Sequence, residues 1–301
     1  MGRIWRLVKW VLLVAVLIGG AHLYYLTTLS ATEHYPEDDF LAQAANKSAL
    51  IIVAHDDDMV GGAGTMTKLT RAGWHIRELC FYQQWGFRSE KDSLKNPTRK
   101  RDLKAVAVIQ GLEGVDPVDL NFRRDLTAEK PWMPMPYADL ERSYDMDTLR
   151  SIIGRYIELH RPSAIFTLDD SVGGYGHPDH VVMSRLVLEY CARHAQDASF
   201  PVQRVYQMVF PPSLAERVLG EHPTYLAAKQ VYGRPGMPLP DVQVDITPFA
   251  SQKKAAMAAY TTEQNSLRKI WPYYHWYPAG IYFRIFDRDF FRVIDVSRPG
   301  S

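Results

Sequence analysis

Two short, mostly apolar runs, each leading into a His/Asp cluster, constrain the fold of this chain more than any other feature. The run at 49–53 leads into residues 54–58, which read Ala-His-Asp-Asp-Asp. The run at 163–168 leads towards residues 176–180, which read Gly-His-Pro-Asp-His. Runs of this length are typical of strands buried in a parallel sheet. Polar clusters that follow them predict a site at the carboxyl ends of the strands.

The rest of the chain continues this alternation of strand and helix patterns. Predicted strands cover 49–53, 75–82, 118–122, 163–168 and 202–210, and predicted helices cover 65–72, 98–110, 145–160, 180–194 and 248–263. Such alternation predicts an α/β fold with a Rossmann-like, mostly parallel sheet and helices on both faces.

The N-terminal sequence predicts a membrane segment that precedes this fold. Residues 10–32 contain no Lys, Arg, Asp or Glu, and three basic side chains precede them. About 20 apolar residues cross a bilayer core, and basic flanks stay in the cytoplasm. We expect residues 1–30 to be an uncleaved anchor that places the rest of the chain in the periplasm or outside the cell. A signal peptide cleaved near residues 19–21 is the alternative.

The remaining residues divide into a tether at 31–48 and one catalytic domain at 49–301. Three of the 35 basic residues lie in the first nine positions, so the rest of the chain carries 32 basic and 34 acidic residues. This balance argues against a nucleic-acid partner. Two cysteines are too few for a disulfide framework. The sequence leaves the oligomeric state open.

Imidazole and carboxylate side chains in the two clusters predict a metal site. His55 and Asp58 are three residues apart in a loop that enters a helix, so both can face one ion, and His180 can supply a third ligand. Three protein ligands and an open position for water are typical of catalytic zinc. We therefore expect Zn²⁺, or another divalent metal, at these three residues.

The neighbouring side chains suit the proton transfers of a hydrolase. Asp57 is free to take a proton from water, and His177 is suited to stabilise an oxyanion or to protonate a leaving amine. Asp179 can hold His177 or a ligand imidazole in one tautomer. A structural interpretation competes for each cluster, because Asp-rich turns cap helices and a His-Pro turn can begin one.

The two clusters resemble the motifs of the PIG-L/LmbE-like family of metal-dependent de-N-acetylases, which act on N-acetylglucosamine-type sugars. The first family motif reads Ala/Pro-His-Pro-Asp-Asp-Glu, and His55, Asp57 and Asp58 match it. The second motif reads Gly-His-Pro-Asp-His, and residues 176–180 match it in full. The resemblance implies the same ligands, base and partner histidine as above. It also implies substrate-lining roles for Arg99 and Asp170. The sequence departs from the first motif twice, with Asp56 in place of proline and Met59 in place of glutamate.

Aromatic side chains near the clusters are candidates for sugar binding. We assign Tyr175, which precedes the second cluster, and Trp85, which follows the strand at 75–82, to substrate contact. The segment 271–277 reads Trp-Pro-Tyr-Tyr-His-Trp-Tyr and fits core packing, with a sugar platform and an interfacial aromatic belt as alternatives. The histidines at 75, 160, 194 and 222 are expected to be structural.

These observations predict a zinc-dependent amidohydrolase that removes acetyl from an N-acetylated amino sugar. An extracytoplasmic location points to a cell-envelope glycan or glycolipid as substrate. Two alternatives remain open: a membrane-tethered glycan-binding protein that lost catalysis, and a hydrolase of another amide or ester.

Overall fold

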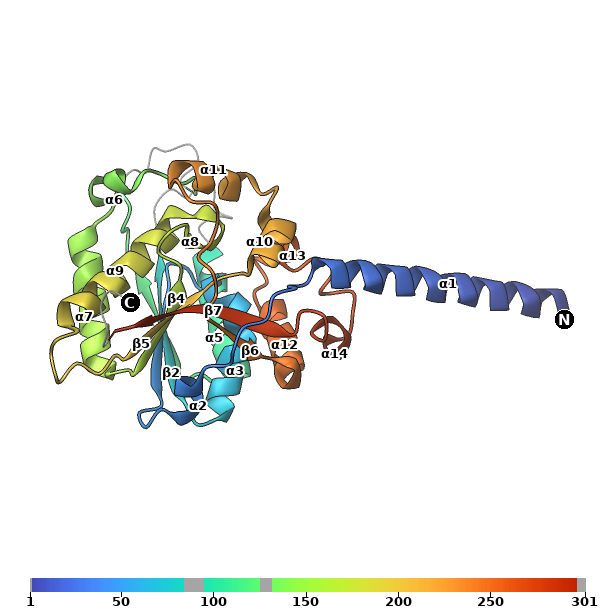
Figure 1. The fold of residues 1–301 in the computed structure, drawn as a ribbon, viewed down its shortest axis with the longest axis horizontal. Helices are drawn as coiled ribbons and strands as arrows, with labels where there is room; N and C mark the ends of the chain where they lie inside the picture. The colour runs from blue at the N-terminus through green and yellow to red at the C-terminus, as the bar shows by residue number, and fades with distance from the viewer. Residues whose placement is uncertain (1, 84–94, 125–131, 297–301) are drawn as a thin grey trace.

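The structure is a computed structural model that describes residues 2–83, 95–124 and 132–296 (Figure 1). Within these residues, seven strands form one sheet in the order β3-β2-β1-β4-β5-β7-β6. The strands are β1 (Ser48–Ile52), β2 (His75–Tyr82), β3 (Gly114–Asp119), β4 (Ala164–Leu168), β5 (Arg204–Met208), β6 (Val242–Asp245) and β7 (Arg288–Asp295).

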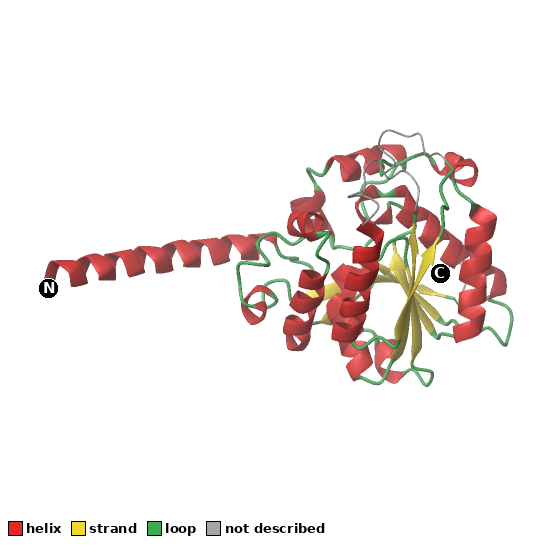
Figure 2. Ribbon diagram, turned by 180° about the vertical axis from the view of Figure 1, so that it is seen from behind, coloured by secondary structure: helices red, strands yellow, loops and turns green. Residues whose placement is uncertain are grey.

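Helices cover both faces of the sheet (Figure 2). α3, α5 and α12 pack with one apolar cluster, which includes Leu69, Val106 and Met257, and α7 and α9 pack with the other, which includes Ile153 and Leu186. The helices are α1 (Gly2–Leu29), α2 (Asp39–Gln43), α3 (Ala63–Arg71), α5 (Lys95–Gln110), α6 (Tyr137–Ser143), α7 (Met146–His160), α8 (Gly173–Gly176), α9 (Pro178–His194), α10 (Pro212–Leu219), α11 (Pro223–Val231), α12 (Ala250–Ala259), α13 (Gln264–Ile270) and α14 (Ala279–Tyr282), with 3₁₀ turns at Asp58–Gly62 and Thr247–Phe249.

The predicted mostly parallel α/β sheet is confirmed. β1 pairs in parallel with both β2 and β4, and β5 continues the parallel order beside β4. Only β7 runs antiparallel to its neighbours β5 and β6 within the described sheet. The strand order reverses between β1 and β4, which creates a crevice at their carboxyl ends. Both His/Asp clusters follow these two strands.

Several elements differ from the sequence prediction. β3 spans Gly114–Asp119 instead of 118–122 and contains Pro117. Proline is tolerated there because β3 is an edge strand. α6 lies in a segment that showed no helical pattern, and the antiparallel strands β6 and β7 were not predicted.

The N-terminal helix α1 projects from the body (Figure 1). By its length and composition alone, the helix at residues 3–29 could cross a membrane. The following segment, which we expected to be a tether, lies against the body. The carbonyl of Pro36 accepts a hydrogen bond from the Gln243 amide at 2.9 Å, and Trp74 Nε1 donates to the Leu41 carbonyl at 3.1 Å.

Candidate active site

A cavity of about 420 Å³ lies at the carboxyl ends of the central strands. Both polar and apolar side chains line it. The polar lining includes His55, Asp57, Asp58, Arg99, His177 and His180, and the apolar lining includes Val209, Phe210, Leu219, Leu267, Ile270 and Trp271. The cavity therefore brings the two sequence clusters to one place.

The first cluster is shaped by a tight turn between β1 and α3. The His55 amide donates a hydrogen bond to Asp58 Oδ2 at 2.8 Å, which folds the carboxylate back over the turn. Gly64, in the first turn of α3, lets this helix approach the sheet edge closely. A Cβ at this position would lie 2.6 Å from the Cβ of Ile246.

The second cluster begins α9 after a glycine-rich loop. The buried Asp169 carboxylate accepts hydrogen bonds from the amides of Ser171 and Val172 at 3.0 and 2.7 Å, which fixes the loop. Gly176 has φ of +110°, and a Cβ there would lie 2.6 Å from the Thr224 carbonyl oxygen. Only glycine fits this position without strain.

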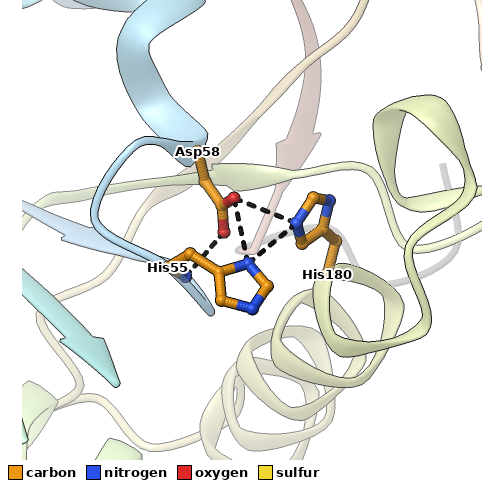
Figure 3. A group of neighbouring side chains, drawn as sticks. All are labelled: His55, Asp58 and His180. Atoms are coloured by element: carbon orange, nitrogen blue, oxygen red, sulfur yellow. Dashed lines mark hydrogen bonds and ion pairs between the residues drawn. The ribbon is translucent and has the colours of Figure 1, made fainter. Parts of the chain in front are cut away.

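Three predicted ligand side chains converge in this cavity (Figure 3). His55 Nδ1 lies 3.3 Å from Asp58 Oδ1 and 3.1 Å from His180 Nε2, and Asp58 Oδ1 lies 2.9 Å from His180 Nε2. His180 Nδ1 is hydrogen-bonded to the Gly173 carbonyl at 2.9 Å, which leaves Nε2 available to an ion. Two imidazoles and one carboxylate form a donor set that fits catalytic zinc.

The electrostatics of these three side chains favour a bound positive charge. Burial lowers the pKa of His55, but the Asp58 and Asp179 carboxylates outweigh it and raise this pKa to about 10. Burial opposes ionisation of Asp58, yet His180 and His55 hold its pKa well below the usual range. Such opposed shifts are typical of a site that stabilises a cation.

Asp179 contacts His55 on the ring nitrogen that faces away from Asp58 and His180. Its Oδ2 is hydrogen-bonded to His55 Nε2 at 3.2 Å. Its Oδ1 accepts from Arg123 at 3.3 Å and from the Tyr144 hydroxyl at 2.5 Å. Arg123 and Tyr144 were not singled out in the sequence. Together these contacts fix the His55 ring, so that Nδ1 faces Asp58 and His180.

Replacing Asp179 with asparagine is expected to weaken metal binding by about 10–100-fold, the usual effect of losing a carboxylate that orients a ligand histidine. Competition with a chelating dye measures the affinity. Asp147→Asn is a suitable control, because the Asp147 side chain is 96% exposed. An unchanged affinity in Asp179→Asn would contradict the orienting role.

Asp57 lies beside the three ligands and pairs with Arg99. Arg99 donates to Asp57 Oδ1 at 2.6 Å and also pairs with Asp56. Burial raises the pKa of Asp57 to about 6, with Arg99 opposing the shift and Asp56 and Asp58 adding to it. A carboxylate with this pKa is suited to general-base catalysis near neutral pH.

His177 is a neutral side chain in this arrangement. Burial lowers its pKa well below the usual range, although Asp179 opposes the shift. His177 Nδ1 accepts a hydrogen bond from the Asp179 amide at 3.2 Å. The proton of the neutral ring is therefore on Nε2, which makes this atom a hydrogen-bond donor.

The other predicted site residues fall in different places. Tyr175 and Arg99 line the cavity. Asp170 is not among the described residues that line it, since its carboxylate accepts hydrogen bonds from Gln207 and Arg292, each at 3.0 Å. Trp85 lies outside the described residues.

The cavity residues that were not assigned to the site in the sequence include His222 and Glu263. His222 lines the cavity, with its ring centroid 5.8 Å from that of Tyr175. Glu263 also lines it and pairs with Lys95 at 3.1 Å and with Arg99 at 3.7 Å. Neither residue belongs to a motif, so its place follows only from the tertiary fold.

Both departures from the first family motif are accommodated by packing. Asp56 is buried, its side chain pairs with Arg99, and its carbonyl accepts a hydrogen bond from the Tyr260 hydroxyl at 2.7 Å. Met59 is buried beside Gly62. Neither side chain displaces a predicted ligand.

Fold and site together define a doubly wound α/β protein with His and Asp side chains grouped at its switch point. Residues 50–191 match the PIG-L family model, described as GlcNAc-PI de-N-acetylase. The matched stretch is just under half of the chain and contains both His/Asp clusters.

Curated relatives are deacetylases of an acetamido sugar linked to inositol. The 1D-myo-inositol 2-acetamido-2-deoxy-alpha-D-glucopyranoside deacetylase of Nakamurella multipartita is 33% identical over 40% of this chain and 41% of its own length. That of Thermobifida fusca is 30% identical over 40% and 45%. That of Catenulispora acidiphila is 23% identical over 73% and 76%. The first two matches span less than half of those relatives.

Solved structures share the fold at low identity. N,N'-diacetylchitobiose deacetylase from Pyrococcus horikoshii has a TM-score of 0.52 and 18% identity, covering 86% of this chain and 90% of its own. The 4-carboxy-2-hydroxymuconate hydratase from Pseudomonas putida has a TM-score of 0.53 and 18% identity, covering 82% and 95%. Since one fold carries both activities, the fold alone does not select a reaction.

Proposed function

We propose that this protein is a zinc-dependent deacetylase that removes the acetyl group from an N-acetylated, GlcNAc-type amino sugar. The observation that carries the proposal is the convergence of His55, Asp58 and His180 in one cavity, with Asp57 beside them. The curated relatives support the reaction class, because each is described as the deacetylase of a 2-acetamido sugar.

Each of these cavity residues has a separate role in the proposed amide hydrolysis. A zinc ion held by the three ligands supplies Lewis acidity, which polarises a carbonyl and lowers the pKa of water to about 7. Asp57 takes the proton of the attacking water and returns it to the amide nitrogen as the C–N bond breaks, which releases acetate and the free amine. The His177 Nε2 hydrogen bonds to the oxyanion that develops on the acetamide oxygen. Asp179 keeps the His55 ring in the orientation that binds the metal.

The proposed location is the extracytoplasmic side of a membrane. The helix at residues 3–29 is long enough to span a bilayer, and Arg3, Arg6 and Lys9 lie near its N-terminal end. Basic residues at that end favour a cytoplasmic N-terminus. We therefore propose that α1 anchors the protein and that its substrate is a cell-envelope glycan or glycolipid.

Acetate release tests this proposal. The full chain in detergent, loaded with Zn²⁺, is expected to release acetate from chitobiose-like fragments or from isolated envelope glycolipids. Removal of the metal with a chelator is expected to reduce release to background, and added Zn²⁺ is expected to restore it. Elemental analysis before and after chelation gives the metal content.

Three other results would contradict the proposal in distinguishable ways. Activity that persists in metal-free protein would exclude a metal-dependent reaction. Binding of N-acetylated glycans without acetate release would indicate a glycan-binding protein. Release of a different acid, with no acetate from any amino sugar, would indicate a hydrolase of another amide or ester.

A further inference from the structure

The segment 264–286 has a composition unlike the rest of the body. It contains eight aromatic residues and three basic residues, with no Asp or Glu. The fold divides these aromatics into two groups. Trp271, Tyr274 and Tyr282 are buried in the core, whereas the Trp276 side chain is 62% exposed. Core packing therefore explains only part of the segment.

A second part of the segment packs against the end of α1. The His22 ring lies edge-on to Tyr273 with centroids 4.7 Å apart, and it stacks on Trp276 and Tyr277 with centroids 5.7 Å away in each case. His22 Nδ1 is also hydrogen-bonded to the Tyr277 hydroxyl. One turn further on, Leu26 is fully buried. These contacts fix the last turns of α1 to the body.

The backbone of Tyr273 has an unusual conformation at this contact with α1. Tyr273 has φ of +63°, in the left-handed region that bulky residues rarely adopt. Such a conformation persists only where surrounding contacts hold it. Its ring contact with His22 is one of these contacts.

The length of α1 sets where this aromatic cluster would lie relative to a bilayer. Residues 3–21, ahead of His22, would extend about 28 Å at 1.5 Å per residue. Arg3, Arg6 and Lys9 lie in the first two turns of this stretch, where long basic side chains reach back to the headgroups. A bilayer core is about 30 Å thick. If residues 3–21 span the core, His22 and its aromatic partners fall at the membrane–water interface, where Trp and Tyr are enriched in membrane proteins.

The outer face of the segment suits contact with lipid headgroups. Trp276 and Ile281 are exposed apolar side chains, and Arg268, Lys269 and Arg284 are exposed basic ones. Both ribbon views show α14 beside the root of α1, on the side of the body from which that helix leaves (Figures 1 and 2). Exposed basic residues near a membrane attract anionic headgroups.

We propose that the segment 264–286 is a membrane-contact surface, which seats the body on a bilayer that contains anionic lipid. Trp276 and Ile281 enter the headgroup region, and Arg268 and Arg284 contact lipid phosphates. The proposal rests on the proposed anchoring by α1. Leu267 and Ile270 of the same segment line the cavity, so the proposed membrane-contact surface and the cavity share this segment.

Site-specific fluorescence in nanodiscs tests the surface. The full chain with Ile281→Cys carries an environment-sensitive dye, since the native Cys80 and Cys191 are buried. In discs with anionic phosphatidylglycerol, the dye is expected to shift to shorter wavelength and to be quenched by lipids with a quencher near the headgroup. Leu159→Cys is the matched control, because Leu159 is 74% exposed on α7, far from α1 in both views. Its dye is expected to remain unquenched.

Two further variants separate the possible outcomes. Dye at Leu12→Cys, tested with lipids that carry the quencher deep in the acyl chain, reports insertion of α1 itself. Quenching at residue 12 without quenching at residue 281 would overturn the contact surface and leave the anchor intact, whereas no quenching at residue 12 would overturn both. The double variant Arg268→Gln/Arg284→Gln is expected to reduce quenching at residue 281 in anionic discs to the level seen in zwitterionic discs. Unchanged quenching would overturn the role of the charges.

Discussion

Replacing Asp57 with asparagine is expected to lower kcat for deacetylation by about 10²–10⁴-fold, the usual contribution of a general base. Asparagine has nearly the same shape, but its amide does not take up the proton of the attacking water. The measurement is steady-state acetate release by the Zn²⁺-loaded enzyme. Because Asp57 lies beside the three proposed ligands and is not one of them, the bound metal is expected to remain.

Two controls make this result interpretable. Elemental analysis of Asp57→Asn separates loss of a base from loss of the ion. Asp197→Asn, at an exposed loop aspartate, is expected to keep full activity. If the asparagine variant at residue 57 retained normal kcat, the base would be another group. If it lost its metal, Asp57 would instead contribute to metal binding.

A second large effect is expected from Lys253→Met, which should destabilise the fold by about 3–5 kcal/mol. Lys253 pairs with Asp289, and their side chains are only 3% and 1% exposed. Lys253 Nζ also donates to the Gly61 carbonyl at 2.8 Å, in the turn that follows Asp58. Removing the ammonium leaves a buried, unpaired carboxylate. Thermal unfolding followed by circular dichroism measures the loss.

The double variant Lys253→Met/Asp289→Leu tests whether the two buried charges stabilise the fold as an ion pair. Its destabilisation is expected to be smaller than the sum of the two single effects, because the double change leaves no lone buried charge. Thr65 would still lose its acceptor, since its amide and hydroxyl donate to Asp289 at 2.9 and 2.8 Å. Lys68→Met is the surface control, with an expected effect below about 1 kcal/mol. Similar Tm values for Lys68→Met and Lys253→Met would contradict the role of the pair.

The sequence predicts the centre of the site well because parallel strands bring their carboxyl ends to one edge. His55 and His180 are 125 positions apart, yet each follows a strand of the central pair, β1 and β4. The partners of Asp179 carry no such signal. Arg123 and Tyr144 flank a segment without a clear period, and they meet the carboxylate only through tertiary packing.

Two adjacent aspartates, Asp169 and Asp170, follow β4, and their side chains have different surroundings. The resemblance to the family placed Asp170 at the substrate, but in the structure Asp169 is fully buried and holds the loop that leads to His177. Asp170 instead contacts Gln207 and Arg292 on strands β5 and β7. Sequence patterns do not define which of two adjacent carboxylates faces inward when the strand ends at Leu168.

For the fold, local patterns predict the parallel strands better than the antiparallel edge. β1, β2, β4 and β5 all overlap predicted strands, because continuous apolar runs mark them. β7 spans Arg288–Asp295, where charged and apolar residues are mixed, and its partners β5 and β6 precede it by more than 40 residues. Its pairing therefore has no local signature.

The segment between α1 and β1 also protects an open sheet edge. β6 is the last strand of the sheet, and an uncovered edge strand is a template for pairing with another chain. Pro36 and Tyr35 engage Gln243 of β6 through its amide and its side chain. A soluble form of the protein that began at residue 49 would expose this strand and invite self-association. One that began near residue 31 would keep the edge covered.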